Sequence, residues 1–355
     1  MAENKPTFIE GVGWRYETKH SMYRRMLDHD YYGRCIYMIT ISVEGRRPLL
    51  GVLHTDGEPY VEPTPLGQEV ERCWYAISEF YPEVKALDFQ LMPDHVHGLL
   101  FVKKEMEAHL GQVVNGFKVG CNRAYRRLVC PGGVGVPSPG VAAAGAGPLH
   151  PKHPERGLLF ETGYNDSVLK GKGQLERMFQ YMKDNPRRLA IKRMNPSLFR
   201  VVHELRIGNR VFAAIGNRWL LDWPVRLQVR CHNNTTTRNL ELIAKQKAYF
   251  LQRAEKGAVI VSPCISAGEK EIARAVLDAK RPLIVILENG FPPMYKPPGR
   301  YFEACAEGLL LMLAPWPYHT EKRTISRQQC LALNGMAVEI SSEPWTQDVE
   351  DSMWK

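Results

Sequence analysis

The sequence predicts an α+β domain with an antiparallel sheet backed by helices, followed by an α/β domain with a mostly parallel sheet. In the first half, strand-like segments and helical patterns follow one another in the order strand, strand, helix, strand, helix. In the second half, short runs of almost purely apolar residues alternate with helical patterns, as in a parallel sheet covered on both faces. A chain of 355 residues is long enough for two such domains.

The first domain is predicted at residues 29–203, after a polar and aromatic arm at residues 1–28. Its expected elements are strands at 35–43 and 49–53, a helix at 64–81, one interrupted strand or two short ones at 86–91 and 97–102, and a helix at 110–128. Residues 131–154 are rich in Gly, Ala and Pro and poor in bulky apolar side chains, which indicates a flexible insert. An inert surface loop is the alternative for this stretch.

The second domain is predicted at residues 204–340, and a polar tail at residues 341–355. Its expected strands are 211–218, 258–262, 283–287 and 309–313, and its expected helices are 240–255, 268–279 and 301–307.

Composition restricts the class of protein. The chain has 47 Lys and Arg against 38 Asp and Glu, a net charge of +9 that suits a polyanionic partner but also occurs in proteins without one. None of the eight cysteines form a Cys-x-x-Cys pair, which argues against a zinc ribbon and suits a reducing compartment. There is no apolar leader or run of membrane-spanning length. We therefore expect a soluble cytoplasmic protein without a membrane partner, associated with the nucleoid if the source is bacterial.

Two histidines carry the first candidate site. His95 and His97 lie two residues apart in a β-favouring run, so both project from one face of a strand while Val96 points to the other. Two imidazoles on one face can share a divalent cation. The alternative is a half-exposed strand that happens to carry two histidines.

A helical pattern at residues 174–185 supplies the second part of the candidate site. Tyr181 and Asn185 are four residues apart and flank an apolar stripe, so a phenol and an amide oxygen could approach a metal held on the strand. The alternative makes Tyr181 a core-edge residue and Asn185 a cap before Pro186.

Together these residues resemble the single-tyrosine transposases of the HUH endonuclease superfamily, and most of all the REP-associated tyrosine transposases. The resemblance covers residues 30–195 and rests on Met92-Pro93-Asp94-His95-Val96-His97, on Gly163-Tyr164-Asn165-Asp166 and on residues 181–186. It implies an HUH domain that cleaves and rejoins single-stranded or hairpin DNA. Tyr181 would form a 5′-phosphotyrosine intermediate, while His95, His97 and Asn185 would hold Mg²⁺ or Mn²⁺. A monomer and a homodimer, in which the tyrosine helix serves a partner's site, both remain open.

Two basic clusters flank this proposed site and are candidate contacts to the DNA backbone, with a solvated face as the alternative. One cluster precedes the insert and the other follows the tyrosine; they comprise Lys118, Arg123, Arg126 and Arg127, and Lys183, Arg187 and Arg188.

The second half resembles the Rossmann-like domain of the DNA-processing protein A family. The matching pieces include Ile215-Gly216-Asn217-Arg218 and residues 257–262, 282–290 and 297–300. Candidate anion-binding residues, two of them at an expected helix start, are Gly216, Asn217, Arg218, Ser266 and Gly268. A structural or protein-interaction role for this domain is an equal alternative.

The sequence therefore predicts a metal-dependent single-stranded DNA endonuclease and strand transferase. Two alternatives stay open: a domesticated hairpin-binding protein that no longer cleaves, and a nucleotide-binding protein that acts through its second domain. The chain has no Gly-x-x-x-x-Gly-Lys-Ser/Thr loop, which counts against nucleotide hydrolysis of that type.

Overall fold

The computed structural model describes residues 6–9, 13–16, 26, 29–129, 158–231, 237–292, 295–321 and 323–352. The protein divides into two compact units, Met1–Ala190 and Ile191–Lys355, and this division falls near the end of helix α4, earlier than residue 203. The predicted insert at 131–154 and most of the predicted arm at 1–28 lie outside the described residues.

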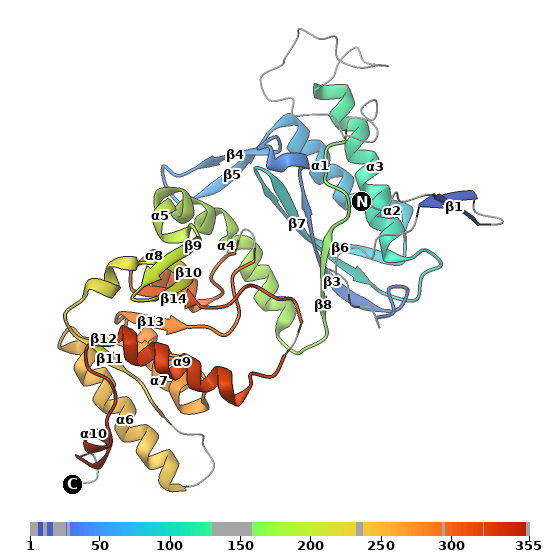
Figure 1. The fold of residues 1–355 in the computed structure, drawn as a ribbon. Helices are drawn as coiled ribbons and strands as arrows, with labels where there is room; N and C mark the ends of the chain where they lie inside the picture. Colours follow the sequence, from blue (N-terminus) through green and yellow to red (C-terminus); the bar gives the residue numbers. More distant parts are fainter. Residues whose placement is uncertain are drawn as a thin grey trace. The chain divides into compact units, whose positions relative to one another are not determined.

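Unit 1 contains a four-stranded sheet in which every pair of neighbours is antiparallel, in the order β6-β7-β3-β8 (Figure 1). This confirms the antiparallel sheet predicted for the first half of the chain. The strands of unit 1 are β1 (Pro6–Ile9), β2 (Gly13–Tyr16), β3 (Cys35–Ser42), β4 (Gly51–His54), β5 (Tyr60–Pro63), β6 (Val84–Met92), β7 (His95–Val102) and β8 (Asn165–Leu169). Its helices are η1 (Glu44–Arg46), α1 (Pro65–Tyr75), α2 (Ile77–Phe80), α3 (Leu110–Val129) and α4 (Gln174–Met194), the last of which extends past the division between the units.

The two faces of this sheet are covered by different helices. Helices α1 and α3 pack on one face, where strand residues such as Ile39 and Val96 join a large core. Helix α4 packs on the other face, where Met182 contacts Met38 and Leu99 in a smaller cluster. The alternation of side chains along a strand thus assigns neighbouring residues of β7 to different layers.

Strands β6 and β7 form a tight hairpin, joined only by Pro93 and Asp94. The segment expected to form one interrupted strand or two short ones is therefore two long strands, paired from Met92–His95 onward with a register shift between Ala86 and Asp88. On the core face of β7, Gly98 leaves room for the indole of Trp74: a Cβ at this position would lie 2.1 Å from a ring carbon of Trp74.

Unit 2 contains a six-stranded mixed sheet in the order β11-β12-β13-β14-β10-β9. Neighbours from β11 to β14 are parallel, whereas β10 is antiparallel to both β14 and β9. Its strands are β9 (Val202–Ile207), β10 (Arg210–Gly216), β11 (Arg226–Gln228), β12 (Val259–Ser262), β13 (Leu283–Ile286) and β14 (Leu310–Ala314). Its helices are α5 (Pro196–Phe199), η3 (Arg218–Asp222), α6 (Thr237–Glu255), α7 (Ala267–Asp278), α8 (Arg300–Ala306), α9 (Arg327–Ile340) and α10 (Gln347–Ser352), the last within the predicted polar tail.

Helices cover both faces of the unit 2 sheet. Side chains of α6, α7 and α8, including Phe250, Ile272 and Phe302, form the core on one face. Helix α9 covers the opposite face through Leu333 and Met336. Among the described helices of the whole chain, none combines the length and apolar character needed to cross a membrane.

Candidate active site

The two histidines lie side by side on the face of β7 that α4 covers. Their rings are 4.8 Å apart between centroids and nearly perpendicular, at 89°. Both residues are buried, at 6% exposure for His95 and 4% for His97, while Val96 between them belongs to the core on the other face. The alternation expected from the sequence is confirmed, and it leaves two imidazoles close together in a nearly dry environment.

Neighbouring side chains fix the orientation of both rings. Nδ1 of His95 lies 2.6 Å from Oδ1 of Asp94, and Nδ1 of His97 lies 2.8 Å from Oγ1 of Thr40. Burial alone would raise the pKa of Asp94, but its hydrogen bond to His95 and the charge of Arg46, 3.4 Å away, together lower that pKa. The Asp94 carboxylate holds a proton on Nδ1 of His95, so Nε2 is the nitrogen of that ring with which a ligand would bind. The Thr40 hydroxyl occupies Nδ1 of His97, which leaves Nε2 of His97 as its other ring nitrogen.

Tyr181 reaches this pair from α4. Its ring lies 5.9 Å from the ring of His97, between centroids, and the adjacent Met182 anchors the helix to the sheet. Burial raises the pKa of the Tyr181 phenol, and the positive charge of Arg188, 5.8 Å from the centre of the ring, partly opposes this rise. The phenol is therefore protonated near neutral pH and lies beside one guanidinium.

Asn185 lies one helical turn beyond Tyr181 and is 4% exposed. Its Nδ2 is buried and has no hydrogen-bond partner among the described residues. Because the oxygen and nitrogen of an amide exchange places when the group turns over, this buried group could present its oxygen instead. Two imidazole Nε2 atoms and one amide oxygen form a donor set that fits a divalent transition metal. In the described part of the chain, no cluster of three or more His, Cys, Asp or Glu side chains offers a metal site.

Three residues near the site were given no role by the sequence. Asp94 and Thr40 hold the two imidazoles, and Gln90 of β6 pairs directly with His97 across the strands, so it projects from the same face. The pairing of β3, β7 and β6 brings these three residues together. Of the three, only Asp94 belongs to the sequence motif that contains the two histidines.

The two basic clusters lie on different layers of unit 1. Lys183, Arg187 and Arg188 belong to α4, on the histidine side, where Arg187 is paired with Asp184 at 2.6 Å. The other cluster belongs to α3, on the opposite face, and comprises Lys118, Arg123, Arg126 and Arg127. Within it, Lys118 donates to the backbone oxygens of Glu161 and Gly163, and Arg127 pairs with Glu69. The structure thus brings one predicted cluster, and not the other, to the layer of Tyr181.

The candidate anion-binding residues of unit 2 divide into two groups at opposite edges of the sheet. Gly216 pairs with Leu311 at the start of β14, because β10 runs antiparallel, and Asn217 and Arg218 follow at that edge. Ser266 and Gly268 instead follow the carboxyl end of β12. In the sheet expected to be mostly parallel, β10 is an antiparallel strand, and this direction places the two groups at opposite edges.

One residue of each group, Ser266 and Asn217, is engaged internally. The amide groups of Ile265 and Ser266 donate to the Glu269 carboxylate at 2.7 and 3.0 Å, and Oγ of Ser266 accepts from the Glu269 amide. An external anion would have to displace this carboxylate from the start of α7. At the other edge, Nδ2 of Asn217 donates to the Gly308 oxygen, and a Cβ at position 216 would collide with the Leu310 oxygen.

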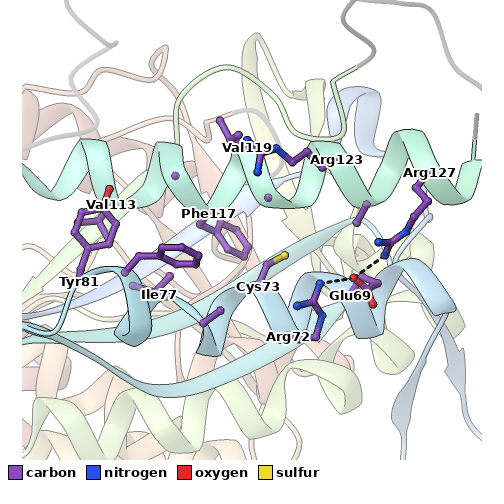
Figure 2. A pocket seen from close by; sticks show the side chains of 15 residues that line it. Glu69, Arg72, Cys73, Ile77, Tyr81, Val113, Phe117, Val119, Arg123 and Arg127 are labelled. Carbon is purple, nitrogen blue, oxygen red and sulfur yellow. Dashed lines mark hydrogen bonds and ion pairs between the residues drawn. The ribbon is translucent and has the colours of Figure 1, made fainter. Parts of the chain in front are cut away.

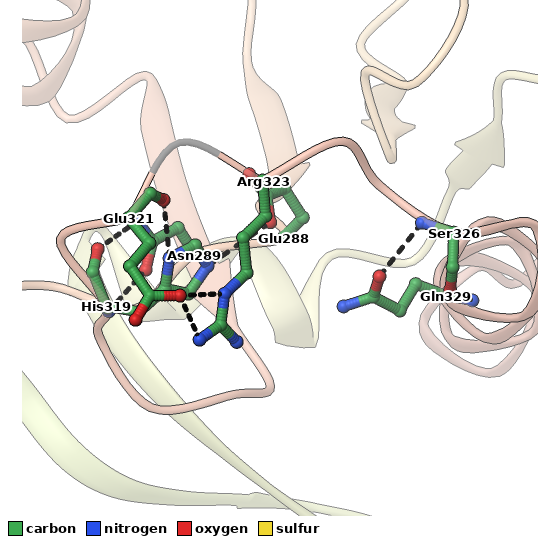
Figure 3. Close-up of polar contacts among 7 residues, drawn as sticks. All are labelled: Glu288, Asn289, His319, Glu321, Arg323, Ser326 and Gln329. Atoms are coloured by element: carbon green, nitrogen blue, oxygen red, sulfur yellow. Dashed lines mark hydrogen bonds and ion pairs between the residues drawn. The ribbon is translucent and has the colours of Figure 1, made fainter.

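A polar cluster also lies where β13 and β14 end (Figure 3). The amide of Asn289 both donates to and accepts from the backbone of His319, at 2.9 and 3.0 Å. The ring of His319 lies near the Glu321 backbone oxygen and 3.7 Å from the Glu288 carboxylate, and Arg323 donates to Glu321 at 2.6 Å. These contacts join the two loops to each other.

Comparison with known proteins gives partial similarities. No protein-family model matches the chain. An uncharacterized protein of Haemophilus influenzae is 21% identical over 182 residues, which cover 46% of this chain and 86% of that protein. Similar solved structures include a REP-associated tyrosine transposase bound to a REP hairpin, with a TM-score of 0.30, 11% identity, and coverage of 46% of this chain and 74% of that chain.

A second similar structure is DNA processing protein A from Helicobacter pylori, described for its single-stranded DNA binding mode. Its TM-score is 0.30 at 16% identity, and the match covers 41% of this chain and 66% of that chain. TM-scores this low measure only partial overlap of folds, so the function proposed below depends on the geometry of the site.

Proposed function

We propose that this protein is a metal-dependent single-stranded DNA endonuclease and strand transferase, in which Tyr181 attacks a phosphodiester. One observation carries the proposal: the Tyr181 ring lies 5.9 Å from His97 on a helix packed against the histidine strand. A nucleophile, a pair of candidate metal ligands and a guanidinium then meet in one buried place, which is the combination that phosphoryl transfer to a side chain requires.

His95, His97 and Asn185 are the residues that would hold a divalent cation, which when bound supplies positive charge to the scissile phosphate. Two imidazoles favour Mn²⁺ over Mg²⁺ as that cation. Asp94 and Thr40 keep the two rings oriented through their Nδ1 atoms. These positions support a preformed site, since neither ring must turn to present its Nε2.

Tyr181 must lose its proton as it attacks, because the neutral phenol is a weak nucleophile. Burial opposes this ionisation, whereas the adjacent Arg188 favours it. The phenolic oxygen forms a bond to phosphorus, the bond to the 3′ oxygen breaks, and that oxygen takes up a proton to become a free 3′-hydroxyl. The product is a 5′-phosphotyrosine, whose phosphoester can be attacked by another 3′-hydroxyl to join a different strand.

The test uses a hairpin oligonucleotide with randomised single-stranded flanks, labelled at its 3′ end and incubated with the full chain and Mn²⁺. We expect a labelled protein–DNA adduct that survives denaturation and disappears with Tyr181→Phe or with a metal chelator. Tyr75→Phe, on an exposed part of α1, is the matched control and should leave the adduct unchanged.

An adduct that persists in Tyr181→Phe would refute the assignment of the nucleophile. Binding of the hairpin by the unmodified protein without any adduct would favour the domesticated binding protein instead.

We also propose that unit 2 is a Rossmann-like domain of the DNA-processing protein A type. Its parallel order from β11 to β14, with helices on both faces, supports this assignment. The antiparallel strands β10 and β9 extend the parallel part at one edge.

A further inference from the structure

Unit 1 has a groove on the sheet face opposite to the histidines. It runs between helices α1 and α2 on one side and α3 on the other, with a volume of about 550 Å³ (Figure 2). Gly116 and Gly120, one helical turn apart on α3, line the groove and carry no side chains to fill it. Its volume lies within the range of about 300–1,000 Å³ that small-molecule sites have. The groove is therefore large enough for a small ligand.

One end of the groove is apolar (Figure 2). Ile77, Val113 and Phe117 are buried and form its wall. The ring of Phe80 also lines the groove and is 78% exposed. Apart from Tyr81, no residue with a hydrogen-bonding side chain lines this end in the described part of the chain. A sugar or a nucleobase would leave polar groups unpaired here, whereas a hydrocarbon chain would not, and it would also cover Phe80.

The other end of the groove is basic (Figure 2). Arg72 and Arg127 both pair with Oε2 of Glu69, at 2.7 and 2.9 Å, so two guanidinium groups share one carboxylate. Arg123 lies one helical turn before Arg127, is exposed, and has no ion pair among the described residues. Three positive charges thus lie beside one negative charge, and Arg123 is available to the carboxylate of a ligand.

The dimensions of the groove fit a single extended chain. At a rise of about 1.5 Å per residue, Val113 and Arg123 lie about 15 Å apart along α3, the length of an extended fatty acid of about twelve carbons. Between these ends, a Cβ on Gly120 would lie 3.2 Å from Sγ of Cys73, so the helices are close together there. A groove this narrow suits a hydrocarbon chain better than a peptide helix about 10 Å across.

We propose that this groove binds a free medium-chain fatty acid, with its carboxylate at Arg123 and its hydrocarbon chain against Ile77 and Phe117. The basic end and the apolar end are complementary to the two parts of this one ligand. The site lies on the other face of the sheet from Tyr181 and does not depend on the proposed DNA chemistry.

The experiment titrates the full chain with dodecanoate, below the concentration at which it forms micelles, in a calorimeter. We expect saturable one-to-one binding. With decanoate and octanoate the affinity should fall by about fourfold for each methylene removed, because each methylene is buried in the apolar end.

Two variants of α3 test the two ends of the groove. Arg123→Gln should weaken dodecanoate binding about fivefold and leave the binding of 1-dodecanol unchanged, since only the carboxylate needs the guanidinium. Arg126→Gln, on the same helix but outside the groove, is the matched control. Gly116→Leu places a side chain in the groove and should abolish binding of both ligands.

The Gly116→Leu variant should fold. A Cβ at this position would meet only the Tyr81 side chain, at 3.4 Å from its hydroxyl oxygen, which is ordinary contact. Leucine also favours a helix more than glycine does. Denaturant unfolding of the variant checks its stability.

The proposal is overturned if dodecanoate shows no saturable binding to the unmodified protein, if its affinity does not depend on chain length, or if Arg123→Gln or Gly116→Leu binds it as tightly as the unmodified protein does. Two other occupants of the groove would also overturn it. One is an amphipathic peptide helix with a glutamate face that binds where dodecanoate does not. The other is a second copy of the chain, shown by a dimer in analytical ultracentrifugation that Gly116→Leu dissociates.

Discussion

At the scale of single residues, the chemistry open to His95 and His97 depends on which ring nitrogens their neighbours occupy. Asp94 and Thr40 hold the two Nδ1 atoms, at 2.6 and 2.8 Å. The sequence motif contains the first of these partners, but the contact from Thr40 arises only when β3 pairs with β7. The orientation of the pair is therefore a property of the sheet and not of the motif alone.

Replacing Asp94 by Ala should weaken metal binding. Loss of a carboxylate that orients a ligating histidine costs about 10–100-fold in metal affinity. Calorimetric titration of the full chain with Mn²⁺ measures the change, and Asp56→Ala, in an exposed turn, is the matched control. Equal affinities of Asp94→Ala and the unmodified protein would contradict the proposed role of His95.

Replacing Arg188 by Gln should move the pH dependence of adduct formation. Burial raises the pKa of Tyr181 and Arg188 lowers it, so removing the guanidinium raises that pKa further. Less phenolate is then present at a given pH, so the rate at that pH should fall, by about tenfold if the pKa rises by one pH unit. Single-turnover rates at saturating DNA check this, with Lys183→Gln as control. An unchanged profile would show that Arg188 does not act on Tyr181.

At the scale of elements, the β6–β7 hairpin depends on a close contact between Gly98 and Trp74. A methyl group at Gly98 would lie 2.1 Å from the indole, whereas a Cβ on Gly57 meets nothing within 4 Å. Gly98→Ala should therefore destabilise unit 1 by about 1–3 kcal/mol through overpacking, and Gly57→Ala by much less. Denaturant unfolding, with hydrogen exchange of residues 95–102 to assign the transition, measures both. Equal stability of the two variants would contradict this packing.

Continuous apolar runs made several elements predictable. The strands expected at 258–262 and 283–287 are found as β12 and β13, because buried strands need apolar side chains on both faces. The antiparallel direction of β10 within the sheet expected to be mostly parallel could not be predicted, since an apolar run carries no information on strand direction. Strand β8, with mixed composition, was missed for lack of such a run. Likewise, the approach of Tyr181 to His97 is a long-range contact that spacing alone cannot specify.

At the scale of unit 1 as a whole, its layered construction separates the two basic clusters. The residues of α4 share a layer with Tyr181, whereas those of α3 lie across the sheet. Lys183→Gln should therefore reduce the slope of log K for single-stranded DNA against log salt by about 0.7, and Arg123→Gln should leave it unchanged. Binding titrations at several salt concentrations measure both slopes. The opposite result would place the DNA on the α3 face.

The central claim is that Tyr181 becomes covalently linked to DNA, and the most direct measurement identifies that linkage. Protein incubated with hairpin DNA and Mn²⁺ is digested with trypsin and nuclease, and the nucleotide-bearing peptide is sequenced by mass spectrometry. We predict a single modified residue, Tyr181, carrying a 5′-phosphate ester. A nucleotide on any other residue, or a cleaved strand with no modified peptide, would contradict the account.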